Sequence, residues 1–570
     1  MKLPALFGFL AVLLAAQPTV PPEDLVRGQE LRGRTRMSGN GMVDFRLKVL
    51  SVMDASRPGE SAVLAEILDP LFQETGVLAG MSGSPVWAGE RLVGAVAFTF
   101  PLQKKPIVGI TPIRAMLRLI PYATNHRPDP EAPSRSFYGM KPIATPLAVS
   151  GGSLDERVLT EVFPERRFVV VPGATGAAMT SSNGRFEPGD AIAVNLVRGD
   201  LNLTGYGTVT WVSNDWVLAF GHPMEMGGRV SLPIHLAEID AVVPSLQVSF
   251  KVGKLGPEVG ALVEDRSPAI LGRLGRKAPR VPLLVRLKSE IQEKTLRYEI
   301  AAGRDTLEQF TPMLLANSLL TWESSDEPAT LAFRWKIRTG YKDRTLELVD
   351  TVSAVNTQDS LRDLVRGMAS VLAHLQGNRF VRVPVNAMEI EVDLASRFQS
   401  SMIEDLQVDR DQYRPGDLVT ARVRLSRHRG APEEKTVQIR IPASAREGIY
   451  PLIASSGNFF LSFDASRNPD RYTPATPDRL LDLLELKVGA RTLSLWMFGN
   501  TDGLTVRGQA YQKLPVFQKG LLEASRSVDK APLMEFVNAD RECEEAVTGV
   551  AITRIRVEDR RFPLPLEESR

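Results

Sequence analysis

The sequence predicts a mainly β fold that is divided among several domains. A chain of 570 residues is too long for one hydrophobic core, because single cores stop growing at roughly 250–300 residues. Short apolar and β-branched runs alternate with turn-forming residues along most of the chain, which contains 44 glycines and 40 prolines. Hydrophobic residues at 43% and charged residues at 24% are typical of a packed globular protein.

The first residues predict a secretory signal, which we assign to residues 1–20. Lys2 precedes the apolar run Leu3 to Ala16, and the chain then turns polar and proline-rich from Gln17 to Pro22. This run is too short to span a bilayer comfortably, and no later stretch is long and apolar enough. We therefore expect a protein that is exported to the periplasm or the extracellular space and has no integral membrane span after signal removal.

Two β units are expected next, at residues 25–122 and 136–276. The first closes with a short helix at Ile113 to Ile120, and the polar, proline-rich stretch Pro121 to Arg135 predicts a linker. The expected strands of the first unit are Phe45–Val52, Ser61–Leu68, Ser84–Trp87, Leu92–Phe100 and Ile107–Thr111. Those of the second are Arg167–Val171, Ala191–Val197, Gly205–Val212, Trp216–Phe220 and Val242–Val252.

The remaining half predicts three regions. Residues 277–387 combine long strands (Val281–Ile291, Ala329–Arg338) with helices (Thr306–Leu320, Ser360–Gln376), which indicates an α+β region. Residues 388–467 alternate strands with Pro-Gly-Asp and Glu-Gly turns, which is typical of an immunoglobulin-like β-sandwich. A C-terminal region, 468–570, holds an expected helix at Pro477–Leu486 and a strand at Arg491–Met497.

Charge and cysteine content exclude several functions. The 69 basic and 67 acidic residues are interspersed, so we expect no nucleic-acid partner. A single cysteine, Cys543, allows neither an intrachain disulfide nor a cysteine-based zinc site, and we interpret it as an incidental thiol. Because no histidine or carboxylate spacing typical of a metal site appears either, no metal or cofactor is expected.

One short segment carries a clear chemical signal. In Gly80-Met81-Ser82-Gly83-Ser84-Pro85 a serine lies between glycines and ahead of a proline, between two expected strands. Glycines allow a tight turn in which backbone amides can point at a developing oxyanion. The pattern is the one found around the nucleophile of chymotrypsin-like peptidases, and it places Ser82, not Ser84, in that role, with the amides of Gly80 and Ser82 as the oxyanion hole. The alternative is a hairpin that uses small residues for geometry alone.

A serine hydroxyl needs a base, which is usually histidine. Of the five histidines, His126 lies in the linker, His374 in an expected helix and His428 among arginines, so these are interpreted as structural or surface residues. His235 is flanked by apolar residues, as a core histidine would be. His222 follows an apolar strand and a glycine, which would present the ring at a strand end, and we favour it as the base.

The third member of a triad is less well defined. Asp69 lies thirteen residues before Ser82, at the end of an expected strand. The alternative role for Asp69 is to bind its own backbone in a turn. Asp215, Glu225 and Asp240, near the His222 segment, remain further candidates.

The pair Asp265-Arg266, between apolar strands, could orient a loop or line a site, and the structural interpretation is favoured. The short basic clusters Arg273 to Arg280 and Arg424 to Arg429 are interpreted as solvated faces. None of these residues is assigned a chemical role.

Two runs together resemble a known family. The run from Phe45 to Leu117, which includes "AEILDPLFQETGVLAGMSGSPVWAGERLVGAVAFTF", resembles the C-terminal part of the SpoIVB-type serine peptidase domain. The run "GYGTVTWVSNDWVLAFGHPM" is similar to the histidine segment of that family. The resemblance implies a Ser/His/Asp acyl-enzyme mechanism with Ser82 as nucleophile, His222 as base and Asp69 as the orienting carboxylate, although the Asp69 match needs a gap.

The order of the two runs departs from the family pattern, because here Ser82 precedes His222 by 140 residues. A triad is defined by geometry and not by chain order. We therefore expect an exported serine endopeptidase with a chymotrypsin-like region of two β-barrel units and a protein or peptide substrate, provided that the units pack with His222 facing Ser82. The alternative is a catalytically inactive exported binding or envelope-assembly protein on a peptidase-derived fold.

Overall fold

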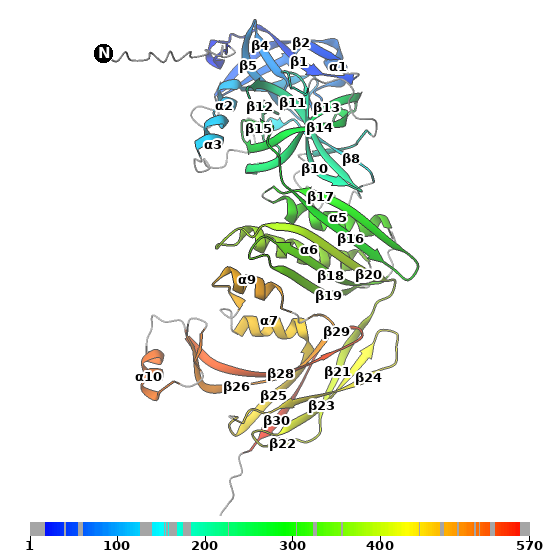
Figure 1. Cartoon of the computed structure of the whole chain (residues 1–570), viewed down its shortest axis with the longest axis vertical. Helices are drawn as coiled ribbons and strands as arrows, with labels where there is room; N and C mark the ends of the chain where they lie inside the picture. The colour runs from blue at the N-terminus through cyan, green and yellow to red at the C-terminus, as the bar shows by residue number, and fades with distance from the viewer. Residues whose placement is uncertain are drawn as a thin grey trace, which may run out of the picture. The chain divides into compact units, whose positions relative to one another are not determined.

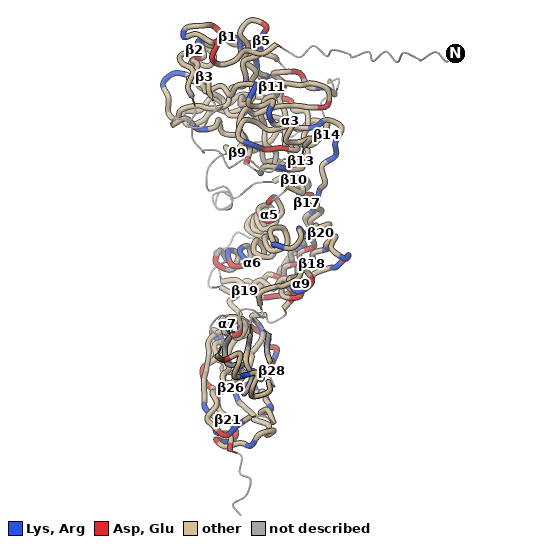
Figure 2. The backbone as a smooth tube through the Cα atoms, turned by 90° about the vertical axis from the view of Figure 1, so that its left-hand side faces the viewer, with Lys and Arg blue, Asp and Glu red and all other residues tan. Residues whose placement is uncertain are grey.

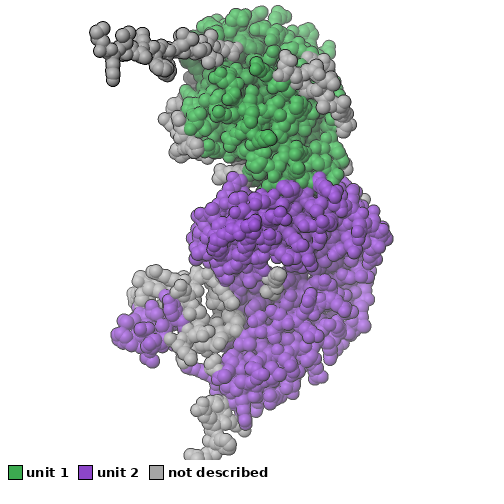
Figure 3. Space-filling view, viewed as in Figure 1, with its two compact units in different colours: residues 1–281, 298–313 green, residues 282–297, 314–570 purple. Residues whose placement is uncertain are grey.

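The computed structural model is mainly β and consists of several sheets (Figure 1). It describes residues 18–38, 41–54, 61–125, 139–152, 154, 158, 168–174, 184–225, 227–303, 305–322, 328–354, 357–443, 445–467, 472–486, 489–506, 509–511, 514–524 and 530–558. The chain divides into two compact units, coloured in Figure 3. The first comprises residues 1–281 and 298–313, and the second comprises residues 282–297 and 314–570.

In the first unit, six antiparallel strands close into a barrel. These are β1 (Glu30–Arg36), β2 (Met42–Asp54), β3 (Ser61–Ile67), β4 (Pro85–Ala88), β5 (Arg91–Thr99) and β6 (Ile107–Pro112). The strands follow the order β4-β1-β2-β3-β6-β5, and β4 also pairs with β5, which completes the ring. Inward-facing side chains such as Leu47, Val63 and Ile110 fill the interior. The short strand β7 (Lys141–Pro142) extends β5, and helix α1 (Pro70–Thr75) lies between β3 and β4 in the chain.

A second ring of strands follows in the same unit. Its strands are β10 (Ala191–Gly199), β11 (Asn202–Ser213), β12 (Trp216–Ala219), β13 (Gly228–Val243), β14 (Phe250–Arg266) and β15 (Ala269–Leu274). They follow the order β10-β13-β14-β15-β12-β11, and β11 pairs again with β10. Strands β8 (Thr145–Ser150) and β9 (Phe168–Pro172) continue from β11, and the end of β17 (Glu293–Ala301) pairs with β10.

The two rings share a hydrophobic cluster. Helices α2 (Ile113–Leu117) and α3 (Leu119–Asn125) contribute Ile113, Met116 and Leu119 to it, next to Leu92 of β5 and Leu271 of β15. The helix expected at 113–120 is therefore present as two short helices. The strand expected at Val242–Val252 is wrong, because residues 244–249 form the connection of the β13–β14 hairpin and Val243 pairs with Phe250.

The second unit contains most of β16 (Arg280–Lys288), in a sheet with β18 (Ala329–Thr339), β19 (Thr345–Ala354) and β20 (Val385–Ala395). Strand β18 pairs antiparallel with β19 and β20, whereas β16 pairs parallel with β20. Helix α6 (Thr357–Gly377) packs on β18 and β19 and buries Leu364, Met368, Leu372 and Leu375, which recur at helical spacing. Helix α5 (Thr306–Trp322) begins among the residues of the first unit.

The C-terminal strands form two sheets around one core. The first sheet contains β21 (Ser400–Val408), β23 (Leu418–Arg427), β24 (Glu433–Arg440) and β29 (Ala546–Thr548). The second contains β22 (Gln412–Tyr413), β25 (Gly448–Ser456), β26 (Thr492–Val506), β27 (Gln509–Tyr511), β28 (Lys530–Glu542) and β30 (Val550–Val557). Alternate residues of β23, including Val419, Ala421 and Val423, face the shared core. Helices α7 (Gly457–Arg467), α9 (Pro477–Leu484) and α10 (Val516–Ala524) connect the strands. The immunoglobulin-like assignment and its bounds stay a prediction.

The predicted signal lies outside the described residues except for its last part. Pro18 and Val20 exchange backbone hydrogen bonds with Leu92, so this end of the segment pairs with β5. Within the described part of the chain, no helix is long and apolar enough to cross a membrane. Lys and Arg are interspersed with Asp and Glu along the chain (Figure 2).

Candidate functional site

The serine turn, residues 80–85, connects the bridge residue Ala79 to β4. Gly80 and Gly83 both adopt positive φ, at 92° and 95°, which side chains with a Cβ rarely tolerate. Gly83 is also enclosed, because a Cβ at this position would lie 1.9 Å from the carbonyl oxygen of Thr208 and 2.5 Å from the amide nitrogen of Phe220. The glycines are therefore required both by the backbone conformation and by close packing against the second ring.

The two serines of the turn differ in their hydrogen bonds. Both are fully buried. The Ser84 hydroxyl donates to the carbonyl of Met81 at 2.6 Å, whereas the Ser82 hydroxyl has no hydrogen-bond partner within the described residues. Ser82 therefore has a hydroxyl that is not committed to holding the turn.

The backbone amides of the turn also divide into two groups. Met81 donates to Leu78 O, Gly83 to Val96 O and Ser84 to Met81 O. The amides of Gly80 and Ser82 donate to no other described residue. These are the two amides that the sequence predicts for an oxyanion hole, and both N–H groups are available for an acceptor.

The histidine turn follows β12 and contains Phe220, Gly221 and His222. Phe220 is a non-glycine residue at φ 69°, and Gly221 follows at φ 70°. A Cβ on Gly221 would lie 2.9 Å from that of Ala95 and 3.0 Å from that of Ala97. Thr111 fixes the turn further, since its hydroxyl donates to the carbonyl of Gly221 at 2.6 Å. The histidine turn therefore packs directly on β5 and β6 of the first barrel.

The His222 ring is buried and oriented by its own loop. His222 is only 2% exposed, and its Nδ1 lies 2.8 Å from the carbonyl oxygen of Pro223. A carbonyl can only accept, so Nδ1 carries the proton and Nε2 is the basic nitrogen of the neutral ring. This is the tautomer that a general base acting through Nε2 requires.

Thr208 on β11 joins the two turns. Its amide donates to Ser82 O at 2.8 Å, its hydroxyl donates to Gly80 O at 2.9 Å, and its carbonyl accepts from the Phe220 amide at 3.2 Å. Next to it, the Thr210 hydroxyl donates to Gly83 O at 2.7 Å. The structure therefore brings the predicted Ser82 and His222 segments together on one strand, despite their separation of 140 residues in the chain.

Asp69 occupies a different place. It precedes α1, and its Oδ2 accepts from the backbone amide of Arg46 at 2.5 Å. In the described residues it makes no contact with His222. Its carboxylate thus ties the end of β3 to β2, and it makes no side-chain hydrogen bond to the start of α1, so this is not the local turn role considered from the sequence.

A different carboxylate organises the loop after His222. Asp265 on β14 is 1% exposed and accepts from the amides of Met224 at 2.7 Å, Glu225 at 2.8 Å and Gly227 at 3.4 Å. Three amide donors around one buried carboxylate fix the loop that begins at His222. The sequence signal was the pair Asp265-Arg266 between two apolar runs.

Of the other candidates, Asp215, Asp240 and His235 have partners outside this arrangement, whereas Glu225 belongs to the loop after His222. Asp215 is exposed and lies 4.0 Å from Arg273, and Asp240 pairs with Lys254 at 2.9 Å. His235 is buried, its Nδ1 lies 2.9 Å from Gly256 O, and burial lowers its pKa. Glu225 contributes its amide to Asp265. His126 lies outside the described residues.

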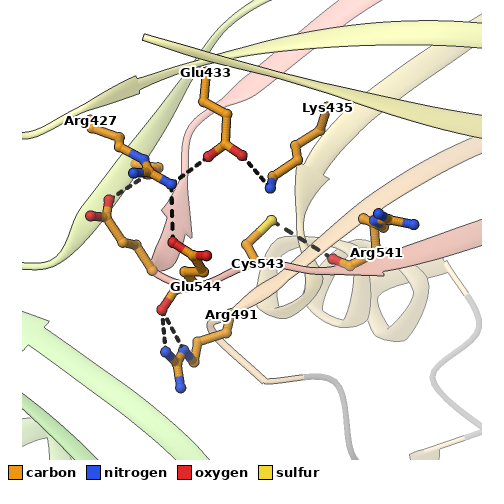
Figure 4. Close-up of polar contacts among 9 residues, drawn as sticks. Arg427, Glu433, Lys435, Arg491, Arg541, Cys543 and Glu544 are labelled. Atoms are coloured by element: carbon orange, nitrogen blue, oxygen red, sulfur yellow. Dashed lines mark hydrogen bonds and ion pairs between the residues drawn. The ribbon is translucent and has the colours of Figure 1, made fainter. Parts of the chain in front are cut away.

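The thiol of Cys543 belongs to the C-terminal core (Figure 4). Burial raises its pKa, so the thiol is held in its protonated, poorly nucleophilic form. Around it Arg427 pairs with Glu433 at 2.6 Å and with Glu544 at 3.3 Å, and Arg491 donates to the backbone carbonyl of Glu544. Nothing in these contacts assigns it a chemical role.

The fold is mainly β, and the serine turn and the histidine turn pack against the same strand of its second ring. Residues 20–117 match the family model of the SpoIVB peptidase S55 domain, so this part of the chain is similar to that domain. The match includes Asp69 and Ser82 and ends before His222. No curated protein and no solved structure is matched by the chain.

Proposed function

We propose that the protein is an exported serine endopeptidase in which Ser82 attacks a peptide carbonyl. The observation that carries this proposal is the arrangement of the serine turn, where the Ser82 hydroxyl makes no hydrogen bond to His222 or to any other described residue, and the Gly80 and Ser82 amides donate to no described residue. The family match supports a peptidase and a protein substrate. Export rests on the apolar segment at the N-terminus.

The proposed mechanism uses groups of both rings. His222 Nε2 accepts the Ser82 hydroxyl proton while the oxygen forms a bond to the substrate carbonyl carbon, and the Gly80 and Ser82 amides stabilise the oxyanion. His222 then donates the proton to the leaving amine. Asp265 acts as a positioning residue, because it holds the loop that carries His222. A water molecule then attacks the acyl group on Ser82 by the same steps in reverse, which releases the acyl group and restores the Ser82 hydroxyl.

One observation favours a second function, a catalytically inactive exported binding or envelope-assembly protein. Ser82 is 0% exposed and His222 is 2% exposed. A substrate carbonyl can reach Ser82 only if the covering residues move. An inactive relative would keep this closed arrangement permanently.

Reaction with a fluorophosphonate probe distinguishes the two functions. The experiment compares the wild type with Ser82→Ala and with the matched variant Ser84→Ala. We expect labelling of the wild type and of Ser84→Ala, and none of Ser82→Ala, with the modified peptide identified by mass spectrometry. Absence of labelling in the folded wild type favours the binding protein.

A second pair of variants tests the base. His222→Gln should slow labelling by about 10²–10⁴-fold, the usual contribution of a general base, whereas His235→Gln should label at the wild-type rate. Equal rates in His222→Gln and the wild type would assign the base elsewhere. Circular dichroism of each variant controls for folding.

A further inference from the structure

Lys251, on β14, is a lysine buried in the protein interior next to the serine turn. The residue is 1% exposed. Lysine is almost never fully buried unless it is paired with an acidic group. Here its Nζ donates to the hydroxyl of Thr35 on β1 at 2.7 Å, and Thr35 is itself fully buried. No carboxylate pairs with Lys251 in the described residues.

The backbone of Lys251 holds the residue that leads into the serine turn. Ala79 donates to Ser249 O at 2.7 Å, and Lys251 donates to Ala79 O at 3.2 Å. These two hydrogen bonds form the isolated bridge between Ala79 and Phe250. The serine turn therefore begins from a short backbone pairing with β14.

The side chain of Lys251 supports the next residue of the turn. Its Cβ and Cδ lie 3.5 Å and 3.4 Å from the position that a Cβ on Gly80 would occupy. The methylene stem therefore lies beside Gly80, which has φ 92°, and Pro146 is nearer still, with its Cγ 3.1 Å from the same position. Gly80 supplies one of the two amides of the proposed oxyanion hole, and the lysine stem is one of the two side chains that adjoin it.

The charges around the amine disfavour its protonation. Among the described residues, the ionisable side chain that acts on it is Arg36 of β1, which pairs with Asp190. The other neighbours described above, Thr35, Ala79 and Gly80, are uncharged. If Nζ were protonated, its positive charge would be both desolvated by burial and repelled by Arg36.

We propose that Lys251 is a proton-linked positioning residue for Ser82: its uncharged side chain fixes the serine turn, and release of the turn is coupled to uptake of one proton from solvent at Nζ. This inference rests on the proposed peptidase function for its catalytic meaning. Burial and Arg36 lower the pKa of Lys251 to about 7 from the usual 10.5, which agrees with an uncharged amine in the closed turn above neutral pH.

Amide hydrogen exchange tests the coupling without any need for catalysis. Exchange of the turn amides of Ala79, Met81, Gly83 and Ser84 is measured between pH 7 and 9.5 and corrected for the intrinsic chemical rate. In the wild type, the opening equilibrium should increase by up to about tenfold for each unit by which the pH falls, and by less as the pH approaches 7, because the open state binds up to one more proton. In Lys251→Met, which keeps an apolar stem, it should not change with pH.

Two further variants complete the test. Lys254→Met, on the same strand but paired with Asp240 at the surface, should keep the wild-type pH dependence. If Lys251→Met fails to fold, Thr35→Val serves instead: it keeps the titrating amine, so the same pH dependence should persist while opening increases at every pH. The proposal would be overturned if Lys251→Met and the wild type showed the same pH dependence. It would also be overturned if the opening equilibrium of the wild type or of Thr35→Val did not depend on pH.

Probe labelling separates this inference from the proposed function. Labelling of Ser82 with no proton-linked opening leaves the peptidase intact and refutes the role of Lys251. Proton-linked opening without labelling supports the role of Lys251 in fixing the turn and refutes the peptidase.

Discussion

The amide of Thr208 donates to the carbonyl oxygen of Ser82 at 2.8 Å, which ties the serine turn of one barrel to a strand of the second ring. The same threonine accepts from Phe220, two residues before His222. One residue thus sets the backbone positions of both predicted catalytic segments. The two segments therefore lie against the same strand although they are far apart in the chain, and a triad is defined by geometry and not by chain order.

Thr208→Val should slow labelling of Ser82 and destabilise the first unit. The change removes the hydroxyl that donates to Gly80 O and leaves that carbonyl buried without this donor. A buried acceptor left unsatisfied costs about 1–3 kcal/mol, which urea denaturation of the wild type and the variant will measure. Thr124→Val, at an exposed helical position, is the control and should lie within about 0.5 kcal/mol of the wild type. Equal stability of Thr208→Val and Thr124→Val would contradict the role given to Thr208.

Gly83→Ala should prevent the two turns from packing together. The new methyl group would meet Thr208 O at 1.9 Å, so the backbone of β11 would have to move. We expect destabilisation above about 4 kcal/mol, or no folded protein. Gly76→Ala is the matched control, because Gly76 also has positive φ (71°, with ψ −162°) but open space around it, and should cost about 1–3 kcal/mol. A similar loss of stability in both variants would show that glycine is required at position 83 by its backbone conformation and not by its packing against Thr208.

The sequence alone was sufficient to predict those features that depend on residues close together in the chain. The serine turn was predictable because glycine and proline at fixed spacing around Ser82 dictate a tight turn. The position of His222 was predictable because an apolar strand followed by glycine ends at that residue. Most strands were predictable for the same reason, while the run Val242–Val252 misled because its β-branched residues conceal the turn at Pro244 and Ser245.

Long-range relationships could not be predicted. Asp69 fitted a local pattern, yet its carboxylate binds Arg46. The carboxylate that fixes the histidine loop, Asp265, lies 43 residues after His222 and reaches it only through the β13–β14 hairpin. Burial of Lys251 contradicts the usual preference of lysine for solvent, so only the folded chain reveals it.

The variants Asp265→Asn and Asp69→Asn should show which of the two carboxylates matters for the reactivity of Ser82. In Asp265→Asn an amide NH₂ replaces one acceptor and faces the amide of Met224 or Glu225, so the histidine loop loses a hydrogen bond and gains a repulsion. We expect labelling to slow by about tenfold or more, equivalent to about 1.4 kcal/mol. Asp69→Asn keeps an acceptor for Arg46 and should label within about twofold of the wild type. The reverse ranking would restore Asp69 as the orienting residue.

Lys251→Met should stabilise the protein, and by more at neutral than at alkaline pH. The pKa of Lys251 is lowered to about 7 in the folded state from 10.5, so between these values the unfolded chain binds more protons than the folded one. Stability of the wild type therefore rises with pH in this window, by up to about 1.4 kcal/mol per unit, and Lys251→Met lacks this contribution.

The measurement is urea denaturation of Lys251→Met and the wild type at several pH values from 7 to 10. Subtracting the two stability curves cancels the titration of all other groups. The excess stability of Lys251→Met should be largest near pH 7 and shrink toward pH 10.5. In the control Lys254→Met this decline should be absent, because pairing with Asp240 raises the pKa of Lys254 in the folded state. A constant difference between Lys251→Met and the wild type would mean that Lys251 is charged in the folded protein, since only a lysine that is neutral when folded makes the difference depend on pH in this range.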